Sequence, residues 1–78
     1  MASFRVIYET RNRIFPLFRN THELLLYARS QENVENYLRE EQLREPEVAI
    51  GNVRIEKLTQ EQGLELFKKL HWGRWVGD

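Results

Sequence analysis

The chain has 78 residues and a mass of 9.5 kDa, and 41% of its residues are hydrophobic while 31% are charged. This length fits a single domain, residues 1–78, with a small core. Twelve basic and twelve acidic side chains balance each other, which gives no reason to expect a nucleic-acid or membrane partner. Because cysteine is absent, disulfides, thiolate zinc sites and cysteine nucleophiles are excluded.

No segment of the sequence is apolar over the length that a membrane helix or a secretory leader requires. The longest apolar run, residues 24–28, is far shorter than the roughly 20 residues that cross a bilayer. Residues 1–5 are not followed by the apolar stretch of a signal peptide. We therefore expect a soluble, cytoplasmic protein.

The N-terminal part of the sequence has extended character. Residues 3–9 alternate apolar and polar side chains, many of them β-branched or aromatic, which predicts a strand, and residues 10–12 suit a turn. Residues 13–18 form a second extended piece. Because Pro16 cannot donate to a β ladder, this piece is either an edge strand or a structured loop.

The next segments predict a turn, a strand and a helix. Residues 19–21 suit a turn, and residues 23–29 alternate again as a strand. Ser30 is placed as the N-cap of a helix over residues 31–43, whose apolar residues fall on one stripe. Pro46 restricts the residue before it and ends this helix.

Residues 48–58 carry the next strong β pattern, which is interrupted by Gly51 and Asn52. These two residues either form the turn of a hairpin or mark a bulge or the entry to a strand. Strand entry is the favoured interpretation, because residues 47–50 make only a short hairpin arm.

The last predicted element is a helix that a capping box introduces. The Thr59 hydroxyl can accept from the third amide, while the Gln62 side chain reaches back to Thr59. Gly73 predicts the end of this helix. The apolar side chains expected on its buried face are Leu64, Leu66, Phe67 and Leu70.

Together these elements predict an α+β fold: a small antiparallel sheet of three to four strands covered by two amphipathic helices. The predicted order is β-β-β-α-β-α. Residues 13–18 are the second strand of this order, and the alternative for them is a structured loop. The residues expected in the core are Leu26, Leu38, Val53, Ile55 and Phe67.

The groups that catalysis, metal binding or a cofactor would need are missing from the sequence. His22 and His71 are 49 residues apart, and no HxxE, HxH or HExxH spacing occurs. The one aspartate is Asp78, and Ser30 is explained by its position as an N-cap. We therefore predict a protein that is not an enzyme and has no catalytic residue, metal or cofactor.

The most unusual segment is the aromatic C-terminal tail, residues 71–78. Tryptophan is costly to leave in water, and chain ends are normally polar. We expect Trp72 to cover the core beside Phe67. We expect Trp75, next to Arg74, to project as an anchor for a partner, because such residues often dominate binding energy.

Charge is distributed unevenly along the chain. Residues 31–48 carry six Glu against two Arg, which makes a second candidate docking surface on the first predicted helix, at Glu32, Glu35 and Glu40. Residues 1–30 carry five Arg against two Glu. Opposite charges on different elements also allow a homo-oligomer.

The sequence supports two hypotheses about function. The first is a non-catalytic small binding protein that docks on another protein, as an accessory subunit, an adaptor or an inhibitor of the kind that phages encode. The alternative is binding of RNA or single-stranded DNA, because arginines among aromatic residues can contact phosphates while the rings stack on bases. The arginines of this alternative surface are Arg5, Arg11, Arg13 and Arg19.

Overall fold

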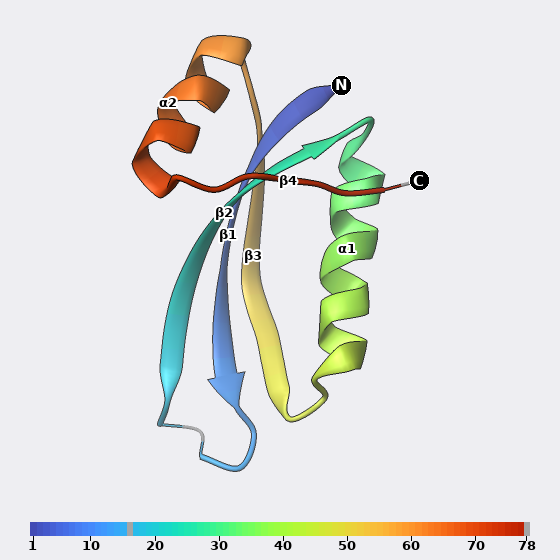
Figure 1. Ribbon diagram of the computed structural model, residues 1–78. Helices are drawn as coiled ribbons and strands as arrows, with labels where there is room; N and C mark the ends of the chain where they lie inside the picture. The colour runs from blue at the N-terminus through green and yellow to red at the C-terminus, as the bar shows by residue number, and fades with distance from the viewer. Residues whose placement is uncertain (16, 78) are drawn as a thin grey trace.

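The computed structural model describes residues 1–15 and 17–77, and it has the α+β fold class expected from the sequence (Figure 1). The elements in chain order are β1 (Ala2–Asn12), β2 (Arg19–Ala28), α1 (Gln31–Arg44), β3 (Val48–Leu58), α2 (Gln60–Leu70) and β4 (Arg74–Trp75). Among the described residues, neither helix combines the length and the apolar character needed to cross a membrane.

The four strands form one mixed sheet in the order β3-β1-β2-β4. β1 pairs antiparallel with β2 as far as Arg11↔Arg19, and it pairs antiparallel with β3 on its other side. The two-residue strand β4 adds to β2 in parallel, with Trp75 beside Tyr27. β3 and β4 are therefore the edge strands.

The two helices lie on opposite faces of the sheet (Figure 1). On the α1 face, Phe4 and Val6 of β1 stand next to the β2 side chains that pair with them, and α1 covers them with one apolar stripe. The buried residues of this core are Phe4, Val6, Leu26, Ala28, Val34, Leu38 and Val76. The predicted burial of Leu26 and Leu38 is confirmed.

α2 packs on the other face through Gly63 and Leu66, which are buried. Gly63 allows a close approach to β1, because a Cβ at this position would lie 3.0 Å from Ser3 Oγ. The predicted buried face of this helix is confirmed for Leu66 but wrong for Leu64 and Phe67, which are 56% and 45% exposed. The helix turns its smallest side chain toward the strands, and this rotation moves its bulkiest apolar side chain outward.

The first hairpin is longer than the sequence predicts. Residues 10–12 and 19–21, expected as turns, belong to β1 and β2, since the ladder between the strands continues through these polar residues. Residues 13–15 and 17–18 form a loop and not a strand, and the prediction for Pro16 lies outside the described residues. With β4 added after α2, the observed order is β-β-α-β-α-β.

β3 is one continuous strand that contains a bulge. Its register against β1 shifts between the pairs Ile7↔Arg54 and Glu9↔Gly51, which leaves one extra residue on β3. Asn52, within the shift, has a φ of 51°, in the left-handed region that asparagine tolerates better than most residues. The hairpin interpretation is thus wrong, and so is the favoured simple strand entry.

The two predicted core residues on β3 differ in their burial. Ile55 is half-buried and packs against the core beside its register partner Val6. Val53 is 42% exposed, so its predicted burial is wrong. The reason is its place on an edge strand next to the bulge, where α1 covers the sheet only in part.

The helix ends agree with the sequence predictions more closely than the turns and the burial of β3 do. The Thr59 hydroxyl accepts from the Gln62 amide at 3.2 Å, and the Thr59 amide donates to Gln62 Oε1 at 3.0 Å, so the predicted capping box is confirmed. α2 ends where His71 adopts a left-handed conformation, two residues before the predicted stop at Gly73. Ser30 is the N-cap of α1, although its side chain makes no capping hydrogen bond.

Candidate functional site

The loop between β1 and β2 lies at the end of the sheet away from α2 and β4 (Figure 1). Hydrogen bonds define its shape. Asn12 Oδ1 accepts from the amides of Ile14 and Phe15 at 2.8 and 3.1 Å. The Arg13 amide donates to Glu47 O at 2.8 Å, which ties the loop to the segment between α1 and β3. These hydrogen bonds hold the backbone of residues 13–15 in place.

Four apolar side chains of this loop are exposed. The exposed fractions are 67% for Ile14, 59% for Phe15, 94% for Leu17 and 66% for Phe18. The rings of Phe15 and Phe18 contact each other, with centroids 5.9 Å apart and planes inclined by 57°. Single exposed apolar residues are ordinary, but a contiguous group marks an interaction site. We call residues 11–15 and 17–19 the hairpin end.

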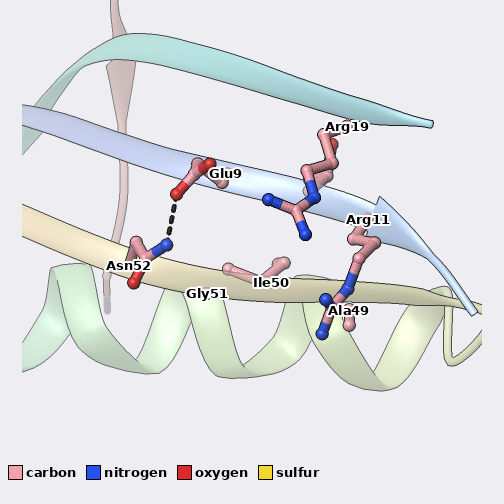
Figure 2. A pocket seen from close by; sticks show the side chains of 8 residues that line it. Glu9, Arg11, Arg19, Ala49, Ile50, Gly51 and Asn52 are labelled. Atoms are coloured by element: carbon pink, nitrogen blue, oxygen red, sulfur yellow. Dashed lines mark hydrogen bonds between the residues drawn. The ribbon is translucent and has the colours of Figure 1, made fainter. Parts of the chain in front are cut away.

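Three arginines belong to the hairpin end. Arg11 and Arg19 lie directly opposite each other in the ladder, an arrangement of like charges that weakens a sheet. Within the described residues, neither of them nor Arg13 forms an ion pair. Arg11 and Arg19 line a hollow of about 250 Å³ (Figure 2). Glu9 also lines this hollow, but its carboxylate accepts a hydrogen bond from Asn52 and, in the described part of the chain, forms no ion pair with either arginine. These guanidinium groups are available to a carboxylate or phosphate from outside.

Arg5, the fourth arginine of the nucleic-acid hypothesis, is engaged within the fold. Its Nε donates to Glu23 Oε2 at 2.7 Å, and its Nη1 lies 3.8 Å from Glu56 Oε1. Lys69 of α2 donates to the other Glu23 oxygen at 2.9 Å. The hydrogen bond from Lys69 lowers the pKa of Glu23, with help from Arg5 and against partial burial. The structure therefore groups three of the four arginines and leaves Arg5 apart.

The C-terminal tail is fastened to the sheet. Val76 is buried in the core, and its amide donates to Tyr27 O at 2.8 Å. Trp72 and Trp75 are 40% and 42% exposed, so Trp72 does not cap the core as expected. The expected contrast between a buried and a projecting tryptophan is therefore absent, because Val76 makes the contact that holds the tail.

The structure brings three of the predicted partner-binding residues together. Arg74, Trp75 and Glu40 line a hollow of about 320 Å³ between the tail and α1. The guanidinium of Arg74 lies 5.4 Å from the centre of an aromatic ring of α1. Glu32 is exposed in the first turn of α1, while Glu35 borders a different hollow, next to β3. The acidic surface is thus divided between two sides of the helix.

The two histidines belong to different elements, His22 to β2 and His71 to the C-cap of α2. His22 stacks on Tyr8 with ring centroids 5.0 Å apart, and its Nε2 lies 2.9 Å from Thr10 Oγ1. Burial raises the pKa of Tyr8, with smaller contributions from Tyr37 and a glutamate. In the part of the chain that the structure describes, no three His, Asp or Glu side chains are grouped to hold a metal ion.

The apolar residues of the hairpin end are not among the site residues that the sequence predicts. The available signal was a run of four large apolar side chains within five positions, residues 14–18, around a proline. Such a run reads equally well as a buried strand, because periodicity alone does not show which side chains reach the core.

Comparisons with protein-family models, with curated proteins and with solved structures each find no match for this chain.

Proposed function

We propose that this protein is a non-catalytic binding protein that docks on another protein through its hairpin end. The observation that carries the proposal is the set of four exposed apolar side chains on a loop with its own hydrogen bonds. Leu17, 94% exposed, makes little contact with its own chain, so only a partner can bury it. A preformed loop also loses less conformational entropy on binding.

The composition of the hairpin end indicates the chemistry of the partner surface. Its apolar centre fits an apolar groove, and protein interfaces are enriched in phenylalanine and arginine. Arg11, Arg13 and Arg19 would then meet acidic side chains at the border of the groove, because guanidinium groups form paired hydrogen bonds with carboxylates. A protein of this kind acts as an accessory subunit, an adaptor or an inhibitor.

Three observations favour a protein over RNA or single-stranded DNA. Bases stack on flat, accessible rings, whereas Phe15 and Phe18 are packed against each other at an angle. The other two exposed side chains, Ile14 and Leu17, are aliphatic and offer no stacking surface. Arg5 forms an ion pair with Glu23, so it is not free to contact phosphates. The chain also has no net charge, whereas nucleic-acid-binding domains are typically basic.

The proposal is tested first by site-specific photo-crosslinking in the cells that produce the protein. A benzophenone side chain replaces Leu17 in one variant and Leu64 in the other. Leu64 is a matched control, a leucine 56% exposed on α2 at the opposite end of the sheet (Figure 1). We expect position 17 to yield a discrete protein adduct that position 64 does not. The same adduct from both positions, or from position 64 alone, would contradict the proposal.

The recovered partner is then titrated with purified variants. Leu17→Ser and Phe18→Ser are expected to weaken binding at least about tenfold, as loss of an interface anchor does, while Leu64→Ser leaves it unchanged. A parallel titration uses single-stranded oligonucleotides at ~150 mM salt. Tight oligonucleotide binding that is abolished by Arg11→Glu together with Arg13→Glu would replace this proposal with the nucleic-acid alternative.

A further inference from the structure

We infer that a second copy of this chain pairs with the free edge of β3, so that two sheets join across a two-fold axis at Ile55. β3 is an edge strand of 11 residues. Its first part is covered, because the Gln42 side chain donates to Val48 O at 2.7 Å and accepts from the Ile50 amide at 2.8 Å. Within the described residues, no strand pairs with the outer edge beyond that point, which leaves a template for a further strand.

Backbone alternation shows which groups of β3 are free. The Arg13 amide donates to Glu47 O on the β3 side, so odd-numbered residues of β1 direct their backbone groups at β3. Arg54 and Glu56 are register partners of such residues, and their backbone groups therefore point toward β1. Ile55 and Lys57 therefore direct both their N–H and C=O groups to the free edge, and Val53, which borders the bulge, directs its C=O there, opposite to the Arg54 N–H.

Charge selects one register for two such edges. An axis at position 54 would place two copies of Arg54 opposite each other, and an axis at position 56 would do the same for Glu56. An axis at Ile55 instead places Arg54 opposite Glu56 of the second copy, twice. Opposite charges in facing positions stabilise an antiparallel pair and like charges destabilise it. Charges on an edge strand usually discourage pairing, but this order of charges is complementary to itself.

The side chains on the α1 face fit the same register. Val53 and Ile55 border an open hollow of about 400 Å³ beside α1, which Glu35 also lines. Lys57 shares this face, because it is the register partner of Phe4 in the core. With the axis at Ile55, Lys57 of the second copy comes to lie opposite Val53. Its aliphatic stem then covers the 42% exposed Val53, and its ammonium group is placed near Glu35.

The inference rests on β3 and is independent of the proposed docking at the hairpin end. Because the two β3 strands would run antiparallel, the two hairpin ends would lie at opposite ends of the joined sheet. Such a dimer presents two docking ends that face away from each other, so each copy keeps its own access to a partner.

The test is a charge-exchange experiment read by sedimentation equilibrium over a range of protein concentrations. Wild-type protein is expected to rise from the 9.5 kDa of one chain toward twice that mass. Arg54→Glu alone and Glu56→Arg alone should each remain monomeric, because each places like charges opposite each other. The double variant, and an equimolar mixture of the two single variants, should dimerise again. Only the register centred on Ile55 predicts this restoration.

Two further measurements separate this interface from others. Lys57→Pro removes an N–H that points away from β1, so it should prevent dimerisation while thermal melting shows an intact fold. Leu17→Ser should leave the dimer unchanged. The inference is overturned if the wild type stays monomeric at the highest concentration, if the charge exchange does not restore dimers, or if Leu17→Ser dissociates them.

Discussion

The two ends of the β1–β2 ladder carry arginines in contrasting surroundings. Near α2, Arg5 contacts two carboxylates, and one of them, Glu23, also bonds Lys69 from the helix. At the hairpin end, Arg11 lies on the same face of the same strand but opposite another arginine, Arg19. The sequence alone gives no reason to expect different surroundings for these two arginines. The fold uses Arg5 to join its own elements, whereas Arg11 forms no ion pair with any residue in the described ranges.

Apolar side chains divide in the same way. Leu25, on the α2 face of β2, is fully buried, whereas Leu17 of the hairpin end is 94% exposed. Buried apolar side chains are therefore concentrated at the end of the ladder that carries Arg5, and exposed ones are concentrated at the hairpin end. Substitutions at the first end should change the free energy of unfolding, and substitutions at the second should change binding.

The largest expected effect follows from the two leucines. Leu25→Ala should lower the free energy of unfolding by about 2–5 kcal/mol, because it removes a fully buried side chain and leaves a cavity. Leu17→Ala should change it by less than about 0.5 kcal/mol. Urea denaturation of both variants measures the difference. Similar losses in the two variants would show that the hairpin end carries part of the core, and the comparison between the ends would fail.

The sequence predicts the elements of the fold well where local signals and tertiary packing agree. The capping box at Thr59 and the helix over 31–43 are found at the expected positions, because caps and helical periodicity depend on nearby residues. The turns expected at 10–12 and 19–21 are absent. Their polar residues resemble turns, but pairing between β1 and β2 extends the strands through them.

The faces of α2 show a second limit of the sequence. Leu64 and Phe67 carry the stronger apolar pattern, yet the buried residues of the helix are Gly63 and Leu66. Periodicity identifies an apolar stripe but not the distance at which a helix packs, and a small residue decides that distance here. The hairpin end was missed for a related reason: an apolar run gives no sign of whether the rest of the chain can reach it.

An intermediate effect on stability is expected at Glu23, whose carboxylate contacts Arg5 of β1 and Lys69 of α2. Glu23→Gln should lower the free energy of unfolding at neutral pH by about 1 kcal/mol, because it weakens contacts with Arg5 and Lys69. The pKa of Glu23 is lowered in the folded protein. Its contribution is thus present above the ordinary glutamate pKa of about 4.3 and is lost as the pH falls through the lower folded value.

The measurement is chemical denaturation of wild type and Glu23→Gln at a series of pH values. The gap between the two proteins should be largest near neutral pH and should close in acid. Lys69→Met supplies a second variant. Its effect should not add fully to that of Glu23→Gln, because both substitutions remove the same ion pair between Glu23 and Lys69. A gap that stays constant with pH would show that the ion pairs do not couple α2 to the sheet.

The smallest effect on stability is the sharpest test of the comparison. Arg19→Glu places a carboxylate opposite Arg11 and replaces a like-charge pair with an opposite one. We expect a gain of about 0.2–1 kcal/mol in the free energy of unfolding, since that is the range of cross-strand charge pairs. Arg19→Gln, which only removes the repulsion, should gain less.

Both variants should nevertheless weaken binding to the partner captured at position 17. Arg19→Glu should do so more strongly, because it removes one guanidinium group and forms an ion pair with the other. Melting temperature and partner titration, measured on the same samples, separate the two effects. A variant that is more stable but binds less well would show that the arginine pair serves the partner at the expense of the fold. A loss of stability in Arg19→Glu would show instead that Arg11 and Arg19 are held apart by contacts within the chain, and the hairpin end would then resemble the end near α2.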